Sequence, residues 1–89
     1  MQIVFERMVQ FSLMVKAGGR LREFNFRKLR TPHEEFSVNV CDERGNRIYF
    51  PMVKVDTDWK ISHTQLPAWI SQNEMSLNDA IEEELRNWR

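Results

Sequence analysis

Two histidines, one cysteine and several paired carboxylates are the residues of this sequence that could support acid–base, nucleophilic or metal chemistry. A metal site needs two or three ligands at short helical or hairpin spacing, and neither His33 nor His63 has a second ligand so placed. A nucleophilic Cys41 would need a base and positive charge beside it, and no histidine can be placed there. We therefore expect surface histidines, a structural Cys41, and neither a catalytic nor a metal site.

The acidic pairs and the glycines supply no catalytic motif. The pairs at 34–35, 42–43 and 56/58 fall in loops or turns, where such residues are common, and Glu82 to Glu84 fall on the outer face of an expected helix. Gly18-Gly19 suit a hairpin loop, and only one glycine remains elsewhere, so there is no phosphate-binding loop. We expect no enzyme activity and no cofactor.

The strongest functional candidate is the segment Lys16–Arg30, "KAGGRLREFNFRKLR", in which basic residues far outnumber the single acid Glu23. Bases stacked on Phe24 and Phe26 within a frame of arginines would follow the chemistry of single-stranded nucleic-acid binding. Alternatively, both phenylalanines belong to the core of a hairpin. The candidate binding residues are Arg20, Arg22, Arg27, Lys28 and Arg30.

The hairpin register favours the core assignment. Apolar residues alternate from Val9 to Lys16, which predicts a half-buried strand, and Gly18-Gly19 provide the positive φ of a two-residue turn. This turn pairs Ala17 with Arg20, Val15 with Arg22, Leu13 with Phe24 and Phe11 with Phe26, so the apolar faces coincide. Arg22 and Lys28 are then expected to bury their stems and keep their charges in water.

A second hairpin passes the same test. Phe36, Val38 and Val40 alternate with polar residues, and a three-residue loop with Gly45 left-handed would pair Asp42 with Asn46. Val40 then faces Ile48, Val38 faces Phe50 and Phe36 faces Met52. Pro51 is expected where its missing donor faces outward, or at a bulge. A tight turn at Asp56-Thr57 leads to a short strand that contains Trp59 and Ile61.

After Leu66 the pattern becomes helical. Pro67 suits a first helical position, which predicts a short helix near 67–73. Ser76 is the expected N-cap of a longer helix near 77–88, whose apolar stripe is Leu77, Ile81, Leu85 and Trp88. The prediction is an α+β fold: an antiparallel meander of four to five strands, with one face packed by the C-terminal helix. Trp59, Trp69 and Trp88 either fill this core or expose an aromatic groove.

Composition is that of one globular domain over residues 1–89, with 42% apolar and 29% charged residues. No apolar run approaches the length of a membrane span, and Glu6 and Arg7 interrupt the position of a signal-peptide centre. The single cysteine favours a reducing compartment, so we expect a cytoplasmic protein. The net charge is zero, yet 16–30 is basic and 74–89 is acidic. Such patches either bind a partner or attract each other within or between chains.

The segment "EFSVNVCDERGNRIYFPMVKVDTDWKI" followed by "LPAWISQNEMSLNDAIEEEL" resembles small uncharacterised proteins found in Bacteroidetes. The shared features are an Asp-x-x-Gly turn, a Trp-x-Ile strand end, a Pro-x-Trp and an "AIEE"-like closing helix, over roughly residues 36–85. The resemblance implies a bacterial protein and carries no activity. The strand order before a helix is also similar, in topology alone, to the PUR repeat, a module that binds single-stranded nucleic acid.

These features predict a non-enzymatic interaction or scaffold domain. Its partner would be another protein or a second copy of the chain, docked on an unpaired edge strand. The alternative is a single-stranded nucleic-acid-binding module that uses the basic hairpin 16–30. No feature indicates membrane association.

Overall fold

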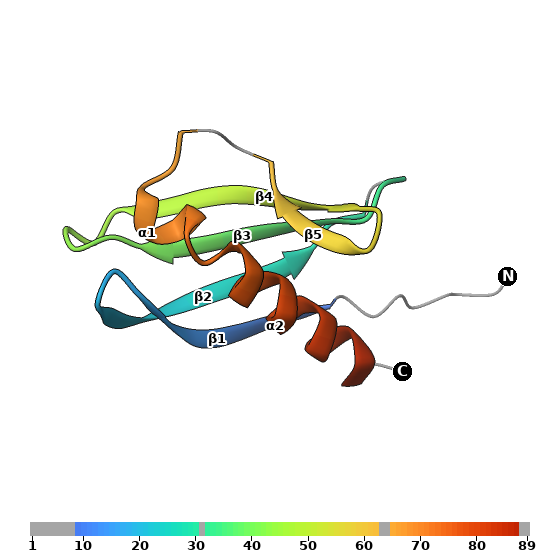
Figure 1. The fold of residues 1–89 in the computed structure, drawn as a ribbon, viewed down its shortest axis with the longest axis horizontal. Coiled ribbons are helices and arrows are strands. Elements are labelled where there is room, and N and C mark those ends of the chain that lie inside the picture. The colour runs from blue at the N-terminus through green and yellow to red at the C-terminus, as the bar shows by residue number, and fades with distance from the viewer. Residues whose placement is uncertain (1–8, 31, 63–64, 88–89) are drawn as a thin grey trace, which may run out of the picture.

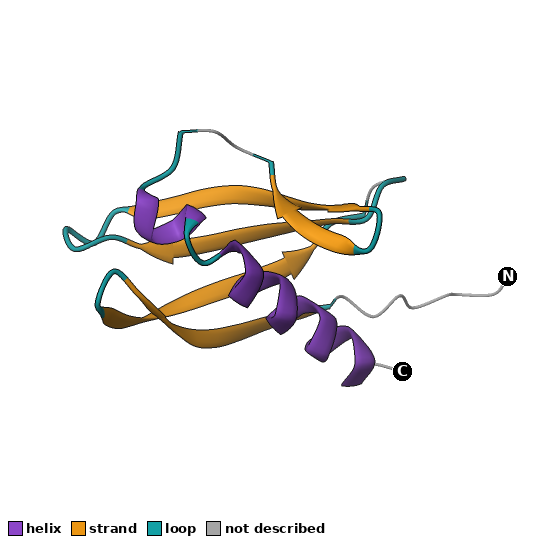
Figure 2. Cartoon of the chain, in the orientation of Figure 1, coloured by secondary structure: helices purple, strands orange, loops and turns teal. Residues whose placement is uncertain are grey.

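The computed structural model describes residues 9–30, 32–62 and 65–87, which form a curled five-stranded sheet followed by two helices (Figure 1). The strands are β1 (Gln10–Ala17), β2 (Arg20–Lys28), β3 (Glu35–Cys41), β4 (Arg47–Val55) and β5 (Asp58–Ile61). Each strand is antiparallel to the next, in the order β1-β2-β3-β4-β5. The helices α1 (Ala68–Ser71) and α2 (Glu74–Asn87) cover one face (Figure 2). The predicted α+β meander under a C-terminal helix is confirmed.

The first hairpin has the predicted register. Ala17 pairs with Arg20, Val15 with Arg22, Leu13 with Phe24 and Phe11 with Phe26. Gly18 and Gly19 adopt φ of 64° and 79°, the left-handed conformation that a two-residue hairpin turn requires. Phe24 and Phe26 are buried on the helix-covered face, and the Phe26 ring stacks on Phe11 at 4.5 Å. The two phenylalanines are therefore core residues and are not free to stack on bases.

The second hairpin and the β4–β5 turn also follow the prediction. The Asp42 N–H donates to the Asn46 carbonyl at 2.9 Å, and Gly45 has φ 82°. Val40 pairs with Ile48 and Val38 with Phe50. The Ser62 N–H donates to the Pro51 carbonyl at 3.0 Å, but Pro51 has no N–H to return. The β4–β5 ladder ends at this position, and β5 is correspondingly short.

The core lies between the sheet and the helices. Trp59, on β5, is completely buried and meets the Phe36 ring edge to face at 5.1 Å. Ile70 of α1 with Leu77 and Ile81 of α2 close the core from the helix side. Each fully buried aliphatic or aromatic side chain contributes about 1.5–3 kcal/mol relative to exposure. The remaining buried apolar residues are Ala17, Phe24, Phe26, Phe36, Val38, Val40, Phe50 and Met52.

The helix boundaries differ from the prediction. Pro67 has ψ 146° and precedes α1, so it is not the first helical residue. The expected N-cap at Ser76 is wrong, because α2 begins at Glu74 and the Leu77 N–H already donates to the Asn73 carbonyl at 3.0 Å. Leu77, Ile81 and Leu85 form the predicted apolar stripe, while Trp88 lies outside the described residues. Neither helix in the described part of the chain is long and apolar enough to cross a membrane.

Candidate functional site

The five basic residues singled out in the sequence do not share one surface. Arg20 is exposed next to the first hairpin turn, Arg27 lies on the sheet face opposite the helices, and Arg30 is exposed in the following loop. Lys28 is half-buried on the helix side of β2. Arg22 is only 6% exposed, so the expectation that its charge extends into water is wrong.

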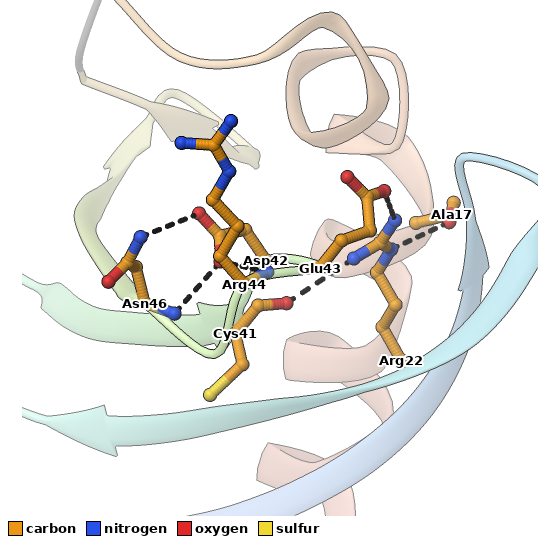
Figure 3. A network of polar contacts seen from close by, with 7 residues as sticks. All are labelled: Ala17, Arg22, Cys41, Asp42, Glu43, Arg44 and Asn46. Carbon is orange, nitrogen blue, oxygen red and sulfur yellow. Dashed lines mark hydrogen bonds and ion pairs between the residues drawn. The ribbon is translucent and has the colours of Figure 1, made fainter.

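Arg22 is a structural residue held by four partners, and Figure 3 shows three of them: Ala17, Cys41 and Glu43. Its Nε donates to the Ala17 carbonyl at 2.9 Å, its Nη1 donates to the Cys41 carbonyl at 3.3 Å, and its Nη2 donates to Glu43 Oε1 at 2.7 Å. The guanidinium stacks on Trp69, with Cζ 3.9 Å from the ring centroid. Planar stacking together with a fork of N–H donors is the arrangement for which arginine is suited.

A break in the sheet explains why an arginine is buried at this position. The β2–β3 pairing covers only Asn25 to Lys28 with Phe36 to Asn39, so the backbone of Cys41 has no partner on β2. Buried carbonyls require a donor, and the Arg22 side chain supplies it. Trp69 closes this end of the core, since it stacks on Arg22 and lies against the Gly18 turn.

The adjoining turn is fixed by Asp42. Its Oδ1 accepts from the backbone N–H groups of Arg44 at 2.9 Å and Asn46 at 2.8 Å (Figure 3). These hydrogen bonds, chiefly that from Asn46, hold the pKa of Asp42 below its ordinary value of 3.8. The acidic pair at 42–43 therefore serves the structure of the turn.

The remaining residues that could support catalysis or metal binding are not brought together in the described part of the chain. Cys41 is half-buried at the end of β3 and lines a shallow hollow with Glu23 and Arg47. His33 is exposed in the β2–β3 loop, and His63 lies outside the described residues. Among 9–30, 32–62 and 65–87, no group of three or more His, Cys, Asp or Glu side chains could hold a metal ion.

The sheet face opposite the helices is polar and mixed in charge. Ser12 and Asn25 hydrogen-bond at 2.6 Å, and Arg47 Nη1 donates to Asn39 Oδ1 at 2.6 Å. Ser12, Asn25, Asn39 and Arg47 form a row of side chains that crosses the four strands β1 to β4. The alternation of side chains along the strands places both signs of charge here. The charged residues of this face are Lys16, Arg27, Arg47 and Lys60 with Glu23, Glu35 and Asp58.

The two edge strands of the sheet, β5 and β1, differ in whether their outward backbone groups have hydrogen-bond partners. On β5 the backbone N–H groups of Trp59 and Ile61 point away from β4, and α2 side chains accept both. Asn78 Oδ1 accepts from Trp59 at 2.7 Å, and Glu74 Oε2 accepts from Ile61 at 2.8 Å. Asn78 is itself buried. Because both N–H groups already have acceptors, they are not available to pair with another strand.

The β1 edge has no such cover within the part of the chain that is described. Among those residues, β1 pairs only with β2. The Lys28 N–H donates to the Val9 carbonyl, and continuing this alternation directs the peptide groups of Gln10, Ser12, Met14 and Lys16 outward. Leu13 and Met14 on this strand are 42% and 54% exposed. β1 therefore presents an eight-residue edge with apolar side chains beside it.

A groove runs along this edge between β1 and α2. Its volume is about 500 Å³. Phe11, Leu13 and Ala80 supply its apolar surface. Ser76, Asp79, Glu83 and Glu84 stand on its helix side, and Ser12 lines it from β1. The sequence predicted an unpaired edge strand but did not show which edge is open or that an acidic helix adjoins it.

Comparison of the chain with protein-family models, with curated proteins and with solved structures found no match.

Proposed function

We propose that the protein is a non-enzymatic interaction module that binds an extended segment of a partner protein by adding it as a strand to β1. The observation that carries the proposal is the contrast between the two edges of the sheet. Glu74 and Asn78 occupy the outward N–H groups of β5, whereas β1 pairs on one side only within the described residues. Strand addition uses such an open row of peptide groups for affinity and adjacent pockets for specificity.

The placement of the basic residues favours this function over nucleic-acid binding. The guanidinium of Arg22 is buried and hydrogen-bonded within the fold, and Phe24 and Phe26 are buried as well. Arg27 lies on a face that also carries Glu23 and Glu35. Nucleic-acid-binding surfaces typically carry a basic patch or stripe on one face, and these residues do not form one.

A proline at Met14 tests the proposal. The Met14 N–H points outward from β1, so Met14→Pro removes a donor for an added strand and leaves the β1–β2 ladder intact. Met14→Ala is the matched control, because it shortens the same side chain and keeps the N–H. Peptides selected from a random displayed library against the wild-type protein are the probes, and fluorescence anisotropy gives their affinities.

We expect Met14→Pro to weaken the selected peptides by about tenfold or more, and Met14→Ala to change binding by less than about threefold. Equal binding to all three proteins would place the peptides elsewhere and refute the proposal, as would a failure to select any binder. Salt-sensitive binding of a labelled single-stranded oligonucleotide that Arg27→Ala abolishes would instead support the nucleic-acid alternative.

A further inference from the structure

We infer that the strand accepted by β1 is basic, with lysine or arginine on either side of an apolar residue on the face that it turns toward α2. This inference rests on the proposed function and specifies the chemistry of its partner. The groove between β1 and α2 carries the argument, because one face of any strand added to β1 must lie against it.

The apolar surface of the groove determines the middle residue of the partner. Phe11 is half-buried and Leu13 is 42% exposed, and both project to the helix side of the sheet with Phe26 and Phe24 as their cross-strand partners. Ala80 faces them from α2. The small alanine side chain leaves room for a partner's aliphatic or aromatic side chain, whose burial there would add favourable apolar contact.

The charge of the helix flank determines the residues beside it. Asp79 and Glu83 are exposed on the groove, and Glu84 lines it as well. Glu83 has Arg86 within 3.6 Å, but both side chains of this pair are more than 60% exposed, so the pair gives way readily to another cation. No basic side chain lines the groove among the residues described. Charge complementarity therefore favours a cationic strand.

The alternation of side chains along a strand gives the spacing of the apolar and basic residues in the partner sequence. Successive residues of an added strand point to opposite faces, so its residues at i, i+2 and i+4 share the helix side. The expected partner motif is Lys/Arg-x-apolar-x-Lys/Arg. The intervening residues lie beside Ser12 and Met14 on the opposite face, where Lys16 is the charged residue of β1.

The same charges disfavour a second copy of this chain as the occupant. Antiparallel pairing of β1 with β1 uses a two-fold axis perpendicular to the sheet, which keeps both α2 helices on the same face. Asp79 and Glu83 of one copy would then face the same residues of the other copy across the joint. Like charges brought together at an interface oppose association.

Three peptides test the inference on the intact protein. The first alternates threonine with a basic-apolar row, Thr-Arg-Thr-Val-Thr-Arg-Thr-Val-Thr-Arg-Thr. The second carries glutamate in place of arginine. The third has the composition of the first in an order that destroys the alternation. Amide chemical shifts of the labelled protein report both the position and the affinity of binding.

Four proteins are titrated: wild type, Asp79→Asn/Glu83→Gln, Glu82→Gln and Met14→Pro. Glu82→Gln is the charge control, because Glu82 lies on the same helix but faces Lys54 at 3.8 Å and does not line the groove. We expect the arginine peptide to shift signals from Phe11 to Val15 and from Asp79 to Glu84. At low salt, Asp79→Asn/Glu83→Gln should weaken its binding about 3- to 10-fold, with less effect from Glu82→Gln.

The outcomes separate this inference from the proposed function. If the glutamate peptide binds β1 as well as the arginine peptide and Met14→Pro weakens both, strand addition stands and the basic motif is refuted. If Met14→Pro binds the arginine peptide as the wild type does, strand addition itself is refuted and the basic motif falls with it. If the reordered peptide binds equally well, the alternating motif alone is refuted, because the backbone groups of an added strand do not depend on residue order. Absence of binding by every peptide, or a protein that is already dimeric through β1, also overturns the inference.

Discussion

Arg22 shows how one side chain can serve the fold at a position where the sequence suggests a ligand contact. Its charge neighbours Glu43, but the carboxylate side chain is 62% exposed whereas that of Arg22 is 5% exposed. The ion pair is therefore weakened by solvent on the Glu43 side. We therefore expect the larger part of the stabilisation to come from the stacking on Trp69 and from the two carbonyl contacts, of which the one to Cys41 replaces the missing β2–β3 pairing.

We expect Arg22→Ala to lower the free energy of unfolding by about 2–3 kcal/mol, because it leaves the Cys41 carbonyl without a donor and removes the stacked guanidinium. Glu43→Ala should cost less than about 1 kcal/mol. Urea denaturation of both variants checks this, with Arg20→Ala as the control for loss of a nearby exposed arginine. A loss for Glu43→Ala equal to that for Arg22→Ala would contradict the assignment, because the ion pair would then supply most of the stabilisation.

At the scale of elements, α2 does more than cover the core. Its side chains at Glu74 and Asn78, one turn apart on the same flank, accept the two outward N–H groups of β5. Glu74 Oε1 also lies 3.8 Å from Lys60 Nζ. Farther along, Asp79 and Glu83 line the groove over β1. One helix thus covers one edge of the sheet and gives an acidic flank to the other.

Removal of the Glu74 and Asn78 side chains should leave the outward N–H groups of β5 free to pair with another strand. We expect Glu74→Ala/Asn78→Ala to lose about 1–3 kcal/mol in the free energy of unfolding, because the Trp59 N–H is buried with its partner removed. The variant should also self-associate with rising concentration, as detected by light scattering. Glu82→Ala/Asn87→Ala removes the same residue types from the same helix and should remain monomeric. A monomeric Glu74→Ala/Asn78→Ala variant of unchanged stability would show that these contacts do not protect the edge.

In the molecule as a whole the net charge is zero, but basic residues are concentrated in 16–30 and acidic residues in 74–89. In the basic hairpin Arg22 is buried, and the other basic residues lie on different faces of the molecule. The acidic helix keeps Asp79 and Glu83 exposed beside the open edge. An open strand edge normally promotes self-pairing, and we expect the acidic flank to oppose it here.

The wild-type protein should therefore sediment as a 10.7 kDa monomer. At about 100 μM and low salt, Asp79→Asn/Glu83→Gln should shift toward a dimer, because neutral side chains remove the repulsion across β1. Adding Met14→Pro to this variant should restore the monomer, since the β1 edge is then blocked. If the neutral variant stays monomeric, or if Met14→Pro leaves its dimer unchanged, charge on the helix flank does not govern self-pairing at this edge.

Local sequence patterns were enough to predict most of the local geometry of the chain. Period-two alternation and the turn glycines fixed both hairpin registers to the residue, because a one-residue slip would move every apolar side chain to the wrong face. The same register identified Phe24 and Phe26 as core residues. The helix start was predicted three residues late, since Ser76 resembles a cap although Asn73 already supplies the first accepting carbonyl.

The contacts between groups on different elements could not be predicted from these patterns, because they depend on how the elements pack on one another. The burial of Arg22 depends on the divergence of β2 from β3 and on Trp69, which lies far along the chain. The cover on β5 depends on where α2 crosses the sheet, as does the groove beside β1. Helix periodicity reveals which residues share a flank but not the position of that flank over the sheet. The open edge, and with it the candidate binding site, is therefore a property of the packing of the helix on the sheet.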